Sequence, residues 1–277
     1  MNQIHASIVL YNNDKNQVEK VIKSFLSTTY NVHLYLIDNS IDNSLSILSN
    51  LDARITYIFI GSNLGYGKAH NIAIKKSLNS NIPYHIVLNP DVWFSHNVIE
   101  ELFQYMQNNP DVGNVMPKIL YGNGEEQYLC KLAPTPLDLI FRRFLPEGKT
   151  KEQMKEKYEL RFTGYDKIME VPILSGCFMF LRTKSLEDVG LFDDRYFMYL
   201  EDVDLSRRIH SKYKTIFYPD VTIYHGYAKE SYANPQLLKY HIKSAISYFN
   251  KWGWFFDKER SKINKKCLHA LRASKYD

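Results

Sequence analysis

The alternation of strand and helix patterns in the first 120 residues constrains the fold most. Short apolar runs, each closed by a polar turn, alternate with segments whose apolar residues recur at helical spacing. This alternation predicts an α/β fold with a Rossmann-like, mostly parallel central sheet flanked by helices. The strands are expected at Ala6–Tyr11, Val32–Ile37, Ile55–Ile60 and His85–Leu88.

Helices are expected between these strands, at Val18–Leu26, Ala69–Leu78 and Ser95–Gln107, the last with Ser95 as its N-cap. In open α/β sheets the ligand binds at the carboxyl ends of the strands. The polar loops that follow the strands are therefore expected to line the functional site.

The regular pattern breaks between Tyr121 and Glu170, a stretch with three prolines and the charged segment Lys149–Glu159. We expect an irregular insertion there with one exposed helix. Regular patterns then return, and they predict a strand at Val171–Leu181, a helix at Asp202–Ser211, strands at Thr215–His225 and a helical tail from Pro235.

Composition excludes several classes of protein. With 45% hydrophobic and 23% charged residues the chain is not a disordered one, and no apolar run approaches the ~20 residues of a membrane-spanning helix. No signal-peptide pattern is present at the start of the chain. The three cysteines are far apart and are expected to be reduced thiols in a cytoplasmic protein.

The net charge of +5 is concentrated in the tail, where residues 237–277 hold ten Lys and Arg against three acidic residues. Aromatic residues are interspersed with these cations. Between 239 and 266 this pattern is typical of a helix lying on an anionic membrane. A helix packed on the domain and an oligomer interface remain open alternatives. Binding of nucleic acid is not expected, because no recognition motif accompanies the charge.

Two loops carry candidate nucleotide and metal ligands. The segment from Asn63 to Asn71 contains Gly65-Tyr-Gly67 but has His70 where a dinucleotide fingerprint requires a third small residue, so it is either a nucleotide loop or a simple turn. Asn89-Pro-Asp91 presents one carboxylate after a buried strand. That carboxylate either binds a divalent cation together with diphosphate oxygens or caps the following segment.

Acidic residues gather at the predicted helix near position 202. Glu201, Asp202 and Asp204 lie in its first turn, where the helix dipole stabilises anions. Capping explains one carboxylate more readily than it explains all three. His225, at the end of a predicted strand, is either a structural histidine or a ligand.

In combination, these motifs resemble those of inverting family-two glycosyltransferases of the GT-A fold. The similarity covers roughly Ser7 to His225 and is strongest to the rhamnosyltransferase-like branch of bacterial surface-polysaccharide synthesis, which includes O-antigen and capsule synthesis. One departure is that the usual Asp-x-Asp is here Asn89-Pro-Asp91, which leaves a single carboxylate. The matching motifs are Ser-Ile-Val-Leu-Tyr-Asn, Ile37-Asp-Asn-Ser with Asp42, Asn63-Leu-Gly-Tyr-Gly with Asn71, Leu88-Asn-Pro-Asp, Ser175-Gly-Cys and Tyr199-Leu-Glu-Asp-Val-Asp-Leu.

The resemblance implies a catalytic domain over 1–235 and a basic, aromatic helical tail over 236–277. The domain would comprise a nucleotide-binding half (1–120), the insertion (121–170) and an acceptor and catalytic half (171–235). Within the insertion, Arg142 and Arg143 either contact a phosphate or are solvated.

The resemblance also implies residue roles. Asp202 would be the general base, Glu201 would hold the acceptor or the donor sugar, and Asp91 and His225 would bind Mg²⁺ or Mn²⁺. Asp38 would accept a hydrogen bond from the N3–H of a pyrimidine. The full set of residues expected around the nucleotide is Tyr11, Asn12, Asp38, Asn63, Gly65, Gly67, Asn71 and Asn89.

The implied reaction is inverting transfer of a sugar from a nucleotide donor to a glycan hydroxyl. The first expectation for the donor is dTDP-L-rhamnose and the second a UDP-hexose, with a polyprenyl-diphosphate-linked glycan as acceptor. The enzyme would act in the cytoplasm, peripherally on the inner face of the membrane. A non-catalytic carbohydrate- or nucleotide-binding protein and an NAD-dependent enzyme are the rival interpretations, and the sequence leaves the oligomeric state open.

Overall fold

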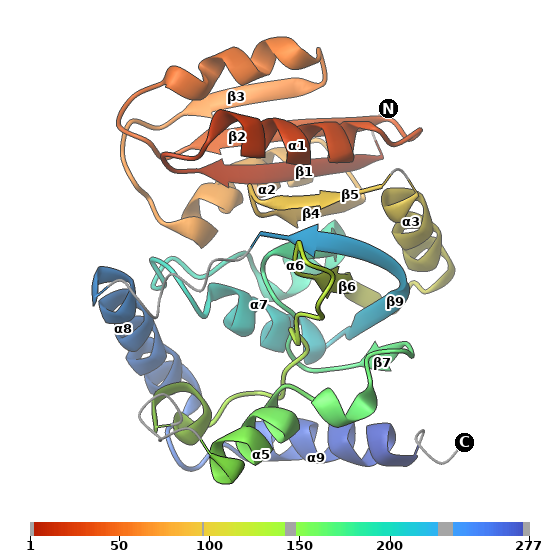
Figure 1. Ribbon diagram of the computed structural model, residues 1–277, viewed down its shortest axis with the longest axis vertical. Helices are drawn as coiled ribbons and strands as arrows, with labels where there is room; N and C mark the ends of the chain where they lie inside the picture. The colour runs from red at the N-terminus through yellow and green to blue at the C-terminus, as the bar shows by residue number, and fades with distance from the viewer. Residues whose placement is uncertain (1–2, 96, 142–147, 227–234, 274–277) are drawn as a thin grey trace.

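The computed structural model describes residues 3–95, 97–141, 148–226 and 235–273 of the chain (Figure 1). A central sheet has the strand order β3-β2-β1-β4-β8-β6-β9-β5, with β7 paired to β9. The expected α/β sheet is therefore confirmed. Its strands are β1 (Ile4–Leu10), β2 (Val32–Asp38), β3 (Ile55–Phe59), β4 (Tyr84–Leu88), β5 (Val92–Phe94), β6 (Val112–Leu120), β7 (Met169–Glu170), β8 (Phe178–Arg182) and β9 (Lys214–His225).

The first four strands are parallel, as the sequence predicts. β1 lies between β2 and β4, and its register pairs Leu10 with Asp38 and Ile8 with Leu88. The carboxyl ends of these strands therefore meet at one edge of the sheet, and the polar loops that follow them share that edge.

The second half of the sheet is mixed in direction. β8 runs antiparallel to β4 and pairs Phe178 with Leu88. β9 runs parallel to β6, and its far end pairs antiparallel with β5, with His225 opposite Val92. This last pairing brings two loops 134 positions apart in the chain to the same place, because Asp91 immediately precedes Val92.

Helices cover the sheet and extend beyond it (Figure 1). In α1 the buried residues Val18, Val21, Ile22 and Phe25 recur at helical spacing, so one face packs on the sheet. The helices are α1 (Lys15–Leu26), α2 (Tyr66–Asn79), α3 (Val98–Asn108), α5 (Lys149–Tyr158), α6 (Thr183–Val189), α7 (Glu201–His210), α8 (Pro235–Trp252) and α9 (Lys258–Ala273). Other helical segments are η1 (Ser44–Leu51), η2 (Leu137–Phe141) and η3 (Arg161–Thr163).

The structure moves several of the expected boundaries. Helix α3 begins at Val98 after Asn97, so Ser95 is not its N-cap. The residues just before it form strand β5, because the end of β9 supplies a pairing partner from far along the chain. The strand expected at Val171–Leu181 begins only at Phe178. Its first part pairs with the insertion instead, through a bridge between Ile173 and Lys131.

The insertion and the tail pack against each other and against the domain. The insertion contains the expected exposed helix, α5. Asn264 of α9 donates to the carbonyl of Ala133 (2.9 Å) and accepts from its N–H (2.8 Å). Figure 1 shows the tail, in blue, on the same side of the molecule as the insertion, in green.

The first tail helix contributes to a hydrophobic core. Tyr248 and Phe249 are fully buried and cluster with Tyr196, Leu200 and Val203 around the start of α7. Packing on the domain, one of the three alternatives for the tail, is thus observed for these aromatic residues. Of the helices in the described ranges, none combines the length and the apolar character needed to cross a bilayer.

Candidate functional site

Asp91 and His225 form a pair at the edge where the carboxyl ends of the first strands meet. The pairing of β5 with β9 sets them side by side, with His225 Nε2 3.3 Å from Asp91 Oδ1. His225 is 4% exposed, whereas the Asp91 side chain retains about a fifth of its surface (20%). The backbone N–H of Gly226 donates to the Asp91 carbonyl at 2.9 Å and fixes the crossing of the two segments.

Asn89 links this pair to helix α2. Its Nδ2 lies 3.2 Å from His225 Nε2, and its Oδ1 accepts from the Tyr66 hydroxyl at 3.1 Å. Its backbone N–H donates to the Cys177 carbonyl. Asn89, expected near the nucleotide, therefore contacts the histidine of the expected metal pair directly.

Gln127 is a site residue that the sequence reasoning missed. Its Oε1 lies 2.9 Å from His225 Nδ1, and its Nε2 donates to the His225 carbonyl at 2.8 Å. The residue lies in the insertion, and no motif singles it out. A histidine that ligates a metal through one ring nitrogen commonly donates from the other to an oxygen, which is the arrangement seen here.

The Asp91–His225 pair can hold a cation only with help from a ligand. Within the part of the chain that the structure describes, no group of three or more His, Cys, Asp or Glu side chains gathers at one point. A hard divalent cation needs about six ligands, and diphosphate oxygens and waters commonly supply the remainder. The donor set fits a cation shared with a bound diphosphate, and imidazole suits Mn²⁺ better than Mg²⁺.

Asp202 connects to the same network through Gly176. Its Oδ2 accepts from the Gly176 N–H at 2.8 Å, and the Gly176 carbonyl accepts from the Tyr66 hydroxyl at 2.7 Å. The single Tyr66 hydroxyl proton is shared between the Gly176 carbonyl and Asn89 Oδ1, so a path of polar contacts joins Asp202 to His225. A Cβ at position 176 would lie 3.0 Å from the Asp202 Cβ, so the glycine permits this close approach.

The negative charges of Asp202 and Asp91 both act on two buried groups, the Cys177 thiol and the Tyr66 hydroxyl. Burial, and then the negative charges of both aspartates, raises the pKa of the Cys177 thiol to about 12. Burial and the nearby carboxylates, Glu201 first, also raise the pKa of Tyr66 well above its usual value. The structure thus brings Asp91, Asp202 and His225 into one neighbourhood. Cys177 is a neutral, buried thiol there, and none of the three cysteines forms a disulfide.

Glu201 is buried beside Asp202 and lacks a full set of partners. It is 5% exposed, and its Oε2 accepts no hydrogen bond from any residue that the structure describes. Burial and the neighbouring Asp202 charge raise the pKa of Glu201 well above its usual value. A protonated carboxyl group can donate a hydrogen bond, which suits contact with a sugar hydroxyl.

The chain is strained where it enters α7. Tyr199 and Leu200 adopt φ values of 69° and 68°, in the left-handed region that bulky residues seldom occupy. Consecutive residues of this kind persist only where the surroundings impose them, commonly at functional sites. They lie directly before Glu201 and set the direction of the two carboxylates that follow.

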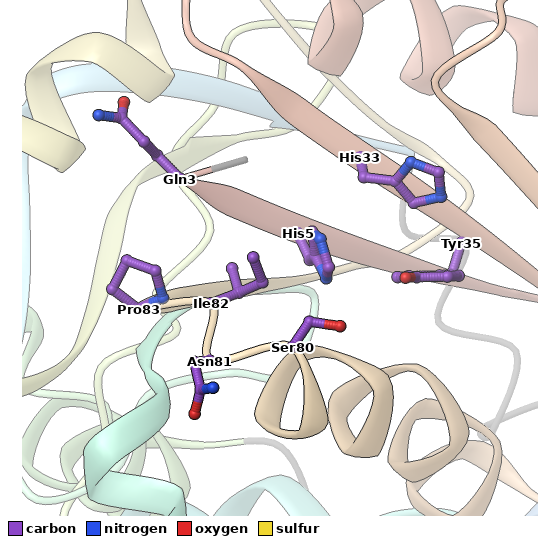
Figure 2. Close-up of a pocket in the computed structure, with 8 residues that line it drawn as sticks. All are labelled: Gln3, His5, His33, Tyr35, Ser80, Asn81, Ile82 and Pro83. Carbon is purple, nitrogen blue, oxygen red and sulfur yellow. The ribbon is translucent and has the colours of Figure 1, made fainter. Parts of the chain in front are cut away.

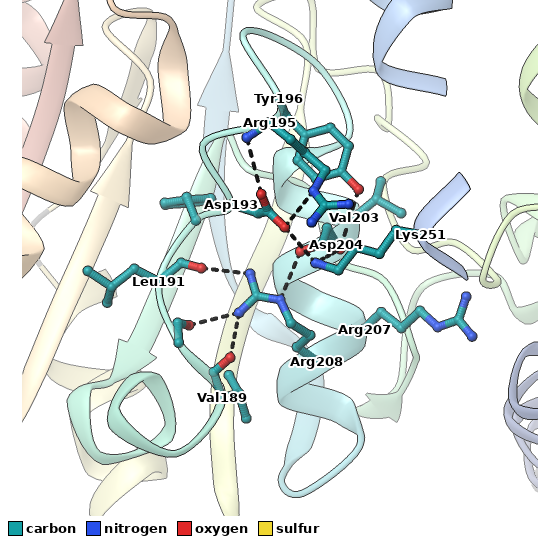
Figure 3. A network of polar contacts seen from close by, with 12 residues as sticks. Val189, Leu191, Asp193, Arg195, Tyr196, Val203, Asp204, Arg207, Arg208 and Lys251 are labelled. Carbon is teal, nitrogen blue, oxygen red and sulfur yellow. Dashed lines mark hydrogen bonds and ion pairs between the residues drawn. The ribbon is translucent and has the colours of Figure 1, made fainter. Parts of the chain in front are cut away.

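Asp204, the third carboxylate of this turn, serves a different purpose. It is fully buried and bonds to Arg208 Nε (2.8 Å), Lys251 Nζ (2.7 Å) and Trp252 Nε1 (2.8 Å). Figure 3 shows the contacts from Arg208 and Lys251 together with Asp193, which also binds Lys251. Asp204 therefore anchors the helix and the tail, and Glu201 and Asp202 are left as the candidates for chemistry.

The residues expected around the base follow β1 and β2. Asp38 is fully buried; its Oδ1 accepts from the Ser40 N–H (2.8 Å) and its Oδ2 from the Tyr57 hydroxyl (2.6 Å). Tyr11 is about half exposed, and Asn12 has a φ of 52° and donates its N–H to Ser40 Oγ. The structure brings Asp38, Tyr11 and Asn12 to one edge, and their contact with a nucleotide stays a prediction.

The glycine motif packs on protein in this structure. Gly65 has a φ of 85°, its N–H donates to Asn63 Oδ1 at 2.9 Å, and a Cβ there would lie 2.1 Å from the Phe197 carbonyl oxygen. A Cβ at Gly67 would lie 2.8 Å from the Phe192 Cβ. Both glycines permit segment 192–201 to approach the start of α2, where the Tyr66 N–H donates to the Phe197 carbonyl at 3.0 Å. The packing of Gly65 and Gly67 against a base stays a prediction.

Asn71 and His70 also hold the protein together. Asn71 Nδ2 donates to the Phe192 carbonyl (2.8 Å) and its Oδ1 accepts from the Phe192 N–H (3.1 Å), so its expected contact with the nucleotide would act through that loop. His70 is fully buried and bonds to Ser7 Oγ at 2.7 Å. This core contact explains why a histidine replaces the third small residue of the fingerprint.

A surface hollow of about 850 Å³ lies at the other end of the strands, where Gln3 precedes β1, His5 lies near the start of β1 and Pro83 precedes β4 (Figure 2). His33 and Tyr35 of β2 complete the wall that Figure 2 shows beside His5. None of the expected site residues lies there. Arg142 and Arg143, expected to meet a phosphate or solvent, lie outside the described residues.

Comparison with known proteins agrees with the motifs. A family model described as glycosyl transferase family 2 matches residues 6–190. An N-acetylglucosaminyl-diphospho-decaprenol L-rhamnosyltransferase of Mycobacterium tuberculosis is 27% identical over 250 residues, which cover 83% of this chain and 79% of that protein. The rhamnosyltransferase WbbL of Escherichia coli K12 is 23% identical over 252 residues, covering 87% and 90%.

Solved structures share the fold at low sequence identity. The S. aureus protein TarS superposes with a TM-score of 0.61 at 14% identity, and GalNAc-T7, solved with UDP, GalNAc and Mn²⁺, with a TM-score of 0.62 at 15% identity. This chain is covered to 97% and 91%, but it spans only 43% and 50% of those longer chains. They support the GT-A fold expected from the sequence.

Proposed function

This chain belongs to glycosyl transferase family 2, and from that premise we propose that it is a metal-dependent, inverting transferase that moves a sugar from a nucleotide donor to a glycan hydroxyl. The observation that carries the proposal is the path of polar contacts from Asp202 to the Asp91–His225 pair. It holds a candidate base and candidate cation ligands at one edge of the sheet, where open α/β folds bind ligands.

Asp202 is the proposed general base. An inverting displacement forms the new C–O bond at the anomeric carbon on the face opposite the leaving diphosphate, and the acceptor hydroxyl must lose its proton as that bond forms. The Gly176 N–H holds Asp202 Oδ2, and the Val203 N–H donates to its Oδ1 at 2.8 Å, so the carboxylate is fixed in direction. Each oxygen keeps a further lone pair with which it can accept the proton.

Asp91 and His225 are the proposed ligands of Mg²⁺ or Mn²⁺. When bound, such a cation offsets the negative charge that develops on the departing nucleoside diphosphate. The chain's own contribution is to set Asp91 Oδ1 and His225 Nε2 within 3.3 Å of each other and to hold the ring from behind through Gln127. Glu201, with its buried Oε2, is proposed to bind a hydroxyl of the donor sugar or the acceptor.

The nucleotide is proposed to lie over the loops that follow β1, β2 and β3. Tyr11 offers an exposed ring to the base, and Asp38 accepts from its N3–H. Asp38 already accepts from Tyr57 and Ser40, but a carboxylate has about four acceptor positions, so a further bond is compatible with those contacts. The remaining proposed contacts are Asn12, Asn63, Gly65, Gly67, Asn71 and Asn89.

The relatives favour a particular donor and acceptor. Two of them are named as rhamnosyltransferases, and one name specifies an N-acetylglucosaminyl-diphospho-decaprenol acceptor. We therefore propose dTDP-L-rhamnose as donor and a polyprenyl-diphosphate-linked glycan as acceptor, in synthesis of a bacterial surface polysaccharide. A UDP-hexose is the second candidate, favoured by a relative named as a hexosyltransferase in Haloferax volcanii, 28% identical over 194 residues.

An acceptor in a membrane calls for contact with its surface. Phe255 and Phe256 are 77% and 96% exposed at the turn between α8 and α9, although Tyr248 and Phe249 of α8 are fully buried. Exposed aromatic side chains beside lysines such as Lys258 suit the interfacial region of an anionic bilayer. We propose that this turn, within the 239–266 segment, rests on the membrane.

A transfer assay with a point variant tests the proposed reaction. Purified protein is given dTDP-L-rhamnose or a UDP-hexose, Mn²⁺ and a polyprenyl-diphosphate-linked N-acetylglucosamine. Asp202→Asn is expected to lower turnover by about 10²–10⁴-fold and to leave donor binding, measured by calorimetry, unchanged. Donor binding without transfer by the wild-type protein would favour the non-catalytic binding role instead.

Asp111→Asn is the matched control. Asp111 pairs with Lys214 at the opposite end of β9 from His225, and its side chain is 55% exposed. The control is expected to retain wild-type turnover. Wild-type turnover in Asp202→Asn would contradict the assignment of the base.

A further inference from the structure

Gln127 is oriented by atoms whose hydrogen-bonding roles are unambiguous. Its Nε2 lies 2.8 Å from the His225 carbonyl oxygen and 3.4 Å from the Leu120 carbonyl oxygen. Carbonyl oxygens only accept hydrogen bonds, so the amide nitrogen must face them. The other end of the side chain, Oε1, therefore faces the His225 ring.

This orientation decides which ring nitrogen of His225 carries a proton. Oε1 of Gln127 lies 2.9 Å from His225 Nδ1, and an amide oxygen can only accept. Nδ1 must therefore be protonated and donate. In a neutral imidazole the lone pair is then on Nε2, the nitrogen that lies 3.3 Å from Asp91 Oδ1.

The Gln127 side chain is held rigidly as well as oriented. Gln127 is 3% exposed, and its backbone N–H donates to the Ile119 carbonyl at 2.9 Å, which ties it to strand β6. It bonds to both the ring and the main chain of His225, so neither can rotate without loss of a hydrogen bond.

From these contacts we propose that Gln127 is a positioning residue, which holds His225 in the Nδ1-protonated tautomer and so directs the Nε2 lone pair toward a cation shared with Asp91. The cation itself rests on the function proposed above, whereas the tautomer follows from the hydrogen bonds alone. Without Gln127, only the Asn89 amide, whose Nδ2 lies 3.2 Å from Nε2 and can only donate, opposes a proton on Nε2. A proton there would be donated to Asp91 and would occupy both proposed ligands.

Two substitutions separate the acceptor role of Gln127 from its packing. Gln127→Glu keeps an acceptor opposite Nδ1 and loses the donor to the His225 carbonyl, and Gln127→Met loses both. Nitrogen-15 NMR of histidine-labelled protein without metal, at a pH where imidazole is neutral, reports the tautomer directly. His225→Gln identifies the His225 signals among those of the nine histidines.

We expect the Nδ1-protonated form in the wild-type protein and in Gln127→Glu, and the Nε2-protonated form in Gln127→Met. Binding of Mn²⁺ in the presence of UDP, followed by electron paramagnetic resonance, should weaken about 10–100-fold in Gln127→Met and not in Gln127→Glu. An unchanged tautomer in Gln127→Met, or a changed tautomer with unchanged Mn²⁺ affinity, would overturn the proposal.

The two readouts also separate this inference from the proposed function. If the wild-type protein binds no Mn²⁺, the proposed cation is wrong, and the NMR spectra alone then decide whether Gln127 sets the tautomer. If the wild-type spectrum shows the Nε2-protonated form, the inference is wrong whatever the protein binds.

Discussion

Lys251 Nζ lies 2.7 Å from Asp204 Oδ1 and 2.8 Å from Asp193 Oδ2 (Figure 3). One ammonium group of the tail helix thereby joins the loop that precedes α7 to the first turn of α7. Asp202 lies in that same turn, two residues before Asp204. The tail therefore helps to position the candidate base, and it is more than an appendage to the domain.

Lys251→Met tests the contribution of these two contacts. The substitution removes two charge-assisted hydrogen bonds but leaves Asp204 paired with Arg208. The loss of stability should therefore be smaller than that caused by an isolated buried charge. We expect the free energy of unfolding, measured with urea, to fall by about 1.5–3 kcal/mol and turnover to fall with it. Lys243→Met, an exposed position on the same helix, should leave both within error. An unaltered stability in Lys251→Met would show that the contacts of Lys251 with Asp193 and Asp204 do not stabilise the fold.

Gly65 offers a second test, because the chain contains a matched glycine. Gly65 and Gly124 have nearly the same φ, 85° and 86°, but a Cβ at Gly65 would lie 2.1 Å from the Phe197 carbonyl oxygen and one at Gly124 would meet nothing within 4 Å. Gly124→Ala should lower the free energy of unfolding by roughly 1–2 kcal/mol through left-handed strain alone.

In Gly65→Ala the segment 192–201 must also move. The fall in the free energy of unfolding should therefore exceed that of Gly124→Ala by at least ~1–3 kcal/mol. Chemical denaturation of both variants gives the difference. If the two losses are equal, the loop yields without cost and Gly65 is needed only for its backbone angle.

The parallel half of the fold could be predicted from the sequence because its signals are local. Each of the runs at Ala6–Tyr11 and Val32–Ile37 carries its own apolar pattern and its own polar stop. Strand β5 (Val92–Phe94) could not be found in this way, since three residues have no pattern and exist as a strand only because the end of β9 pairs with them. Helix α2 begins three residues before the expected Ala69, at Tyr66, whose N–H donates to the carbonyl of Phe197, a residue far along the chain.

The candidate site divides in the same manner. Motifs located Asp91 and Asp202, the end of a predicted strand pointed to His225, and the structure brings the three into one neighbourhood. Gln127 had no motif, because its role depends on an insertion returning to the end of β9. The resemblance assigned roles to Asp202 and Glu201 and none to Asp204, and nothing in the sequence indicated a partner for that third carboxylate. The partners that make Asp204 an anchor, Lys251 and Trp252, are supplied by the tail.

Three buried histidines, His5 in β1, His70 in α2 and His85 in β4, predict a pH dependence of stability. His70 and His85 both bond to Ser7 Oγ, and Ser77 Oγ bonds to both His85 and His5. Burial lowers the pKa of His70 to about 3 and that of His85 well below its usual value. Burial, and then the charge of His33, lowers the pKa of His5 to about 4.

These histidines stay neutral in the folded protein while the unfolded chain takes up protons near pH 6.5. The unfolded state therefore binds more protons between about pH 6.5 and 4, and stability must fall as the pH falls through that window. Each histidine contributes up to ~1.4 kcal/mol per pH unit to this slope.

Urea unfolding from pH 7.5 to 4.5 should show the slope, and His70→Asn should reduce it by up to ~1.4 kcal/mol per pH unit, the contribution of one histidine. His269→Asn, on the surface of α9, should leave it unchanged, and an equal slope in His70→Asn would contradict the assignment.

The exposed aromatic turn makes the membrane proposal testable apart from catalysis. Phe255 and Phe256 contribute little to the core, so replacing both with serine should leave the fold intact. Complete burial of a phenylalanine side chain stabilises by roughly 1.5–3 kcal/mol. Partial insertion of two such side chains should therefore account for about a 10–100-fold difference in vesicle affinity.

We expect the wild-type protein to cosediment with vesicles that contain anionic lipid, and we expect this binding to be weaker in the double variant and at high salt. Ile41→Ser, which removes an 81% exposed apolar side chain far from the tail in sequence, should bind as the wild type does. Equal binding by the double variant and the wild-type protein would remove this turn from any membrane contact.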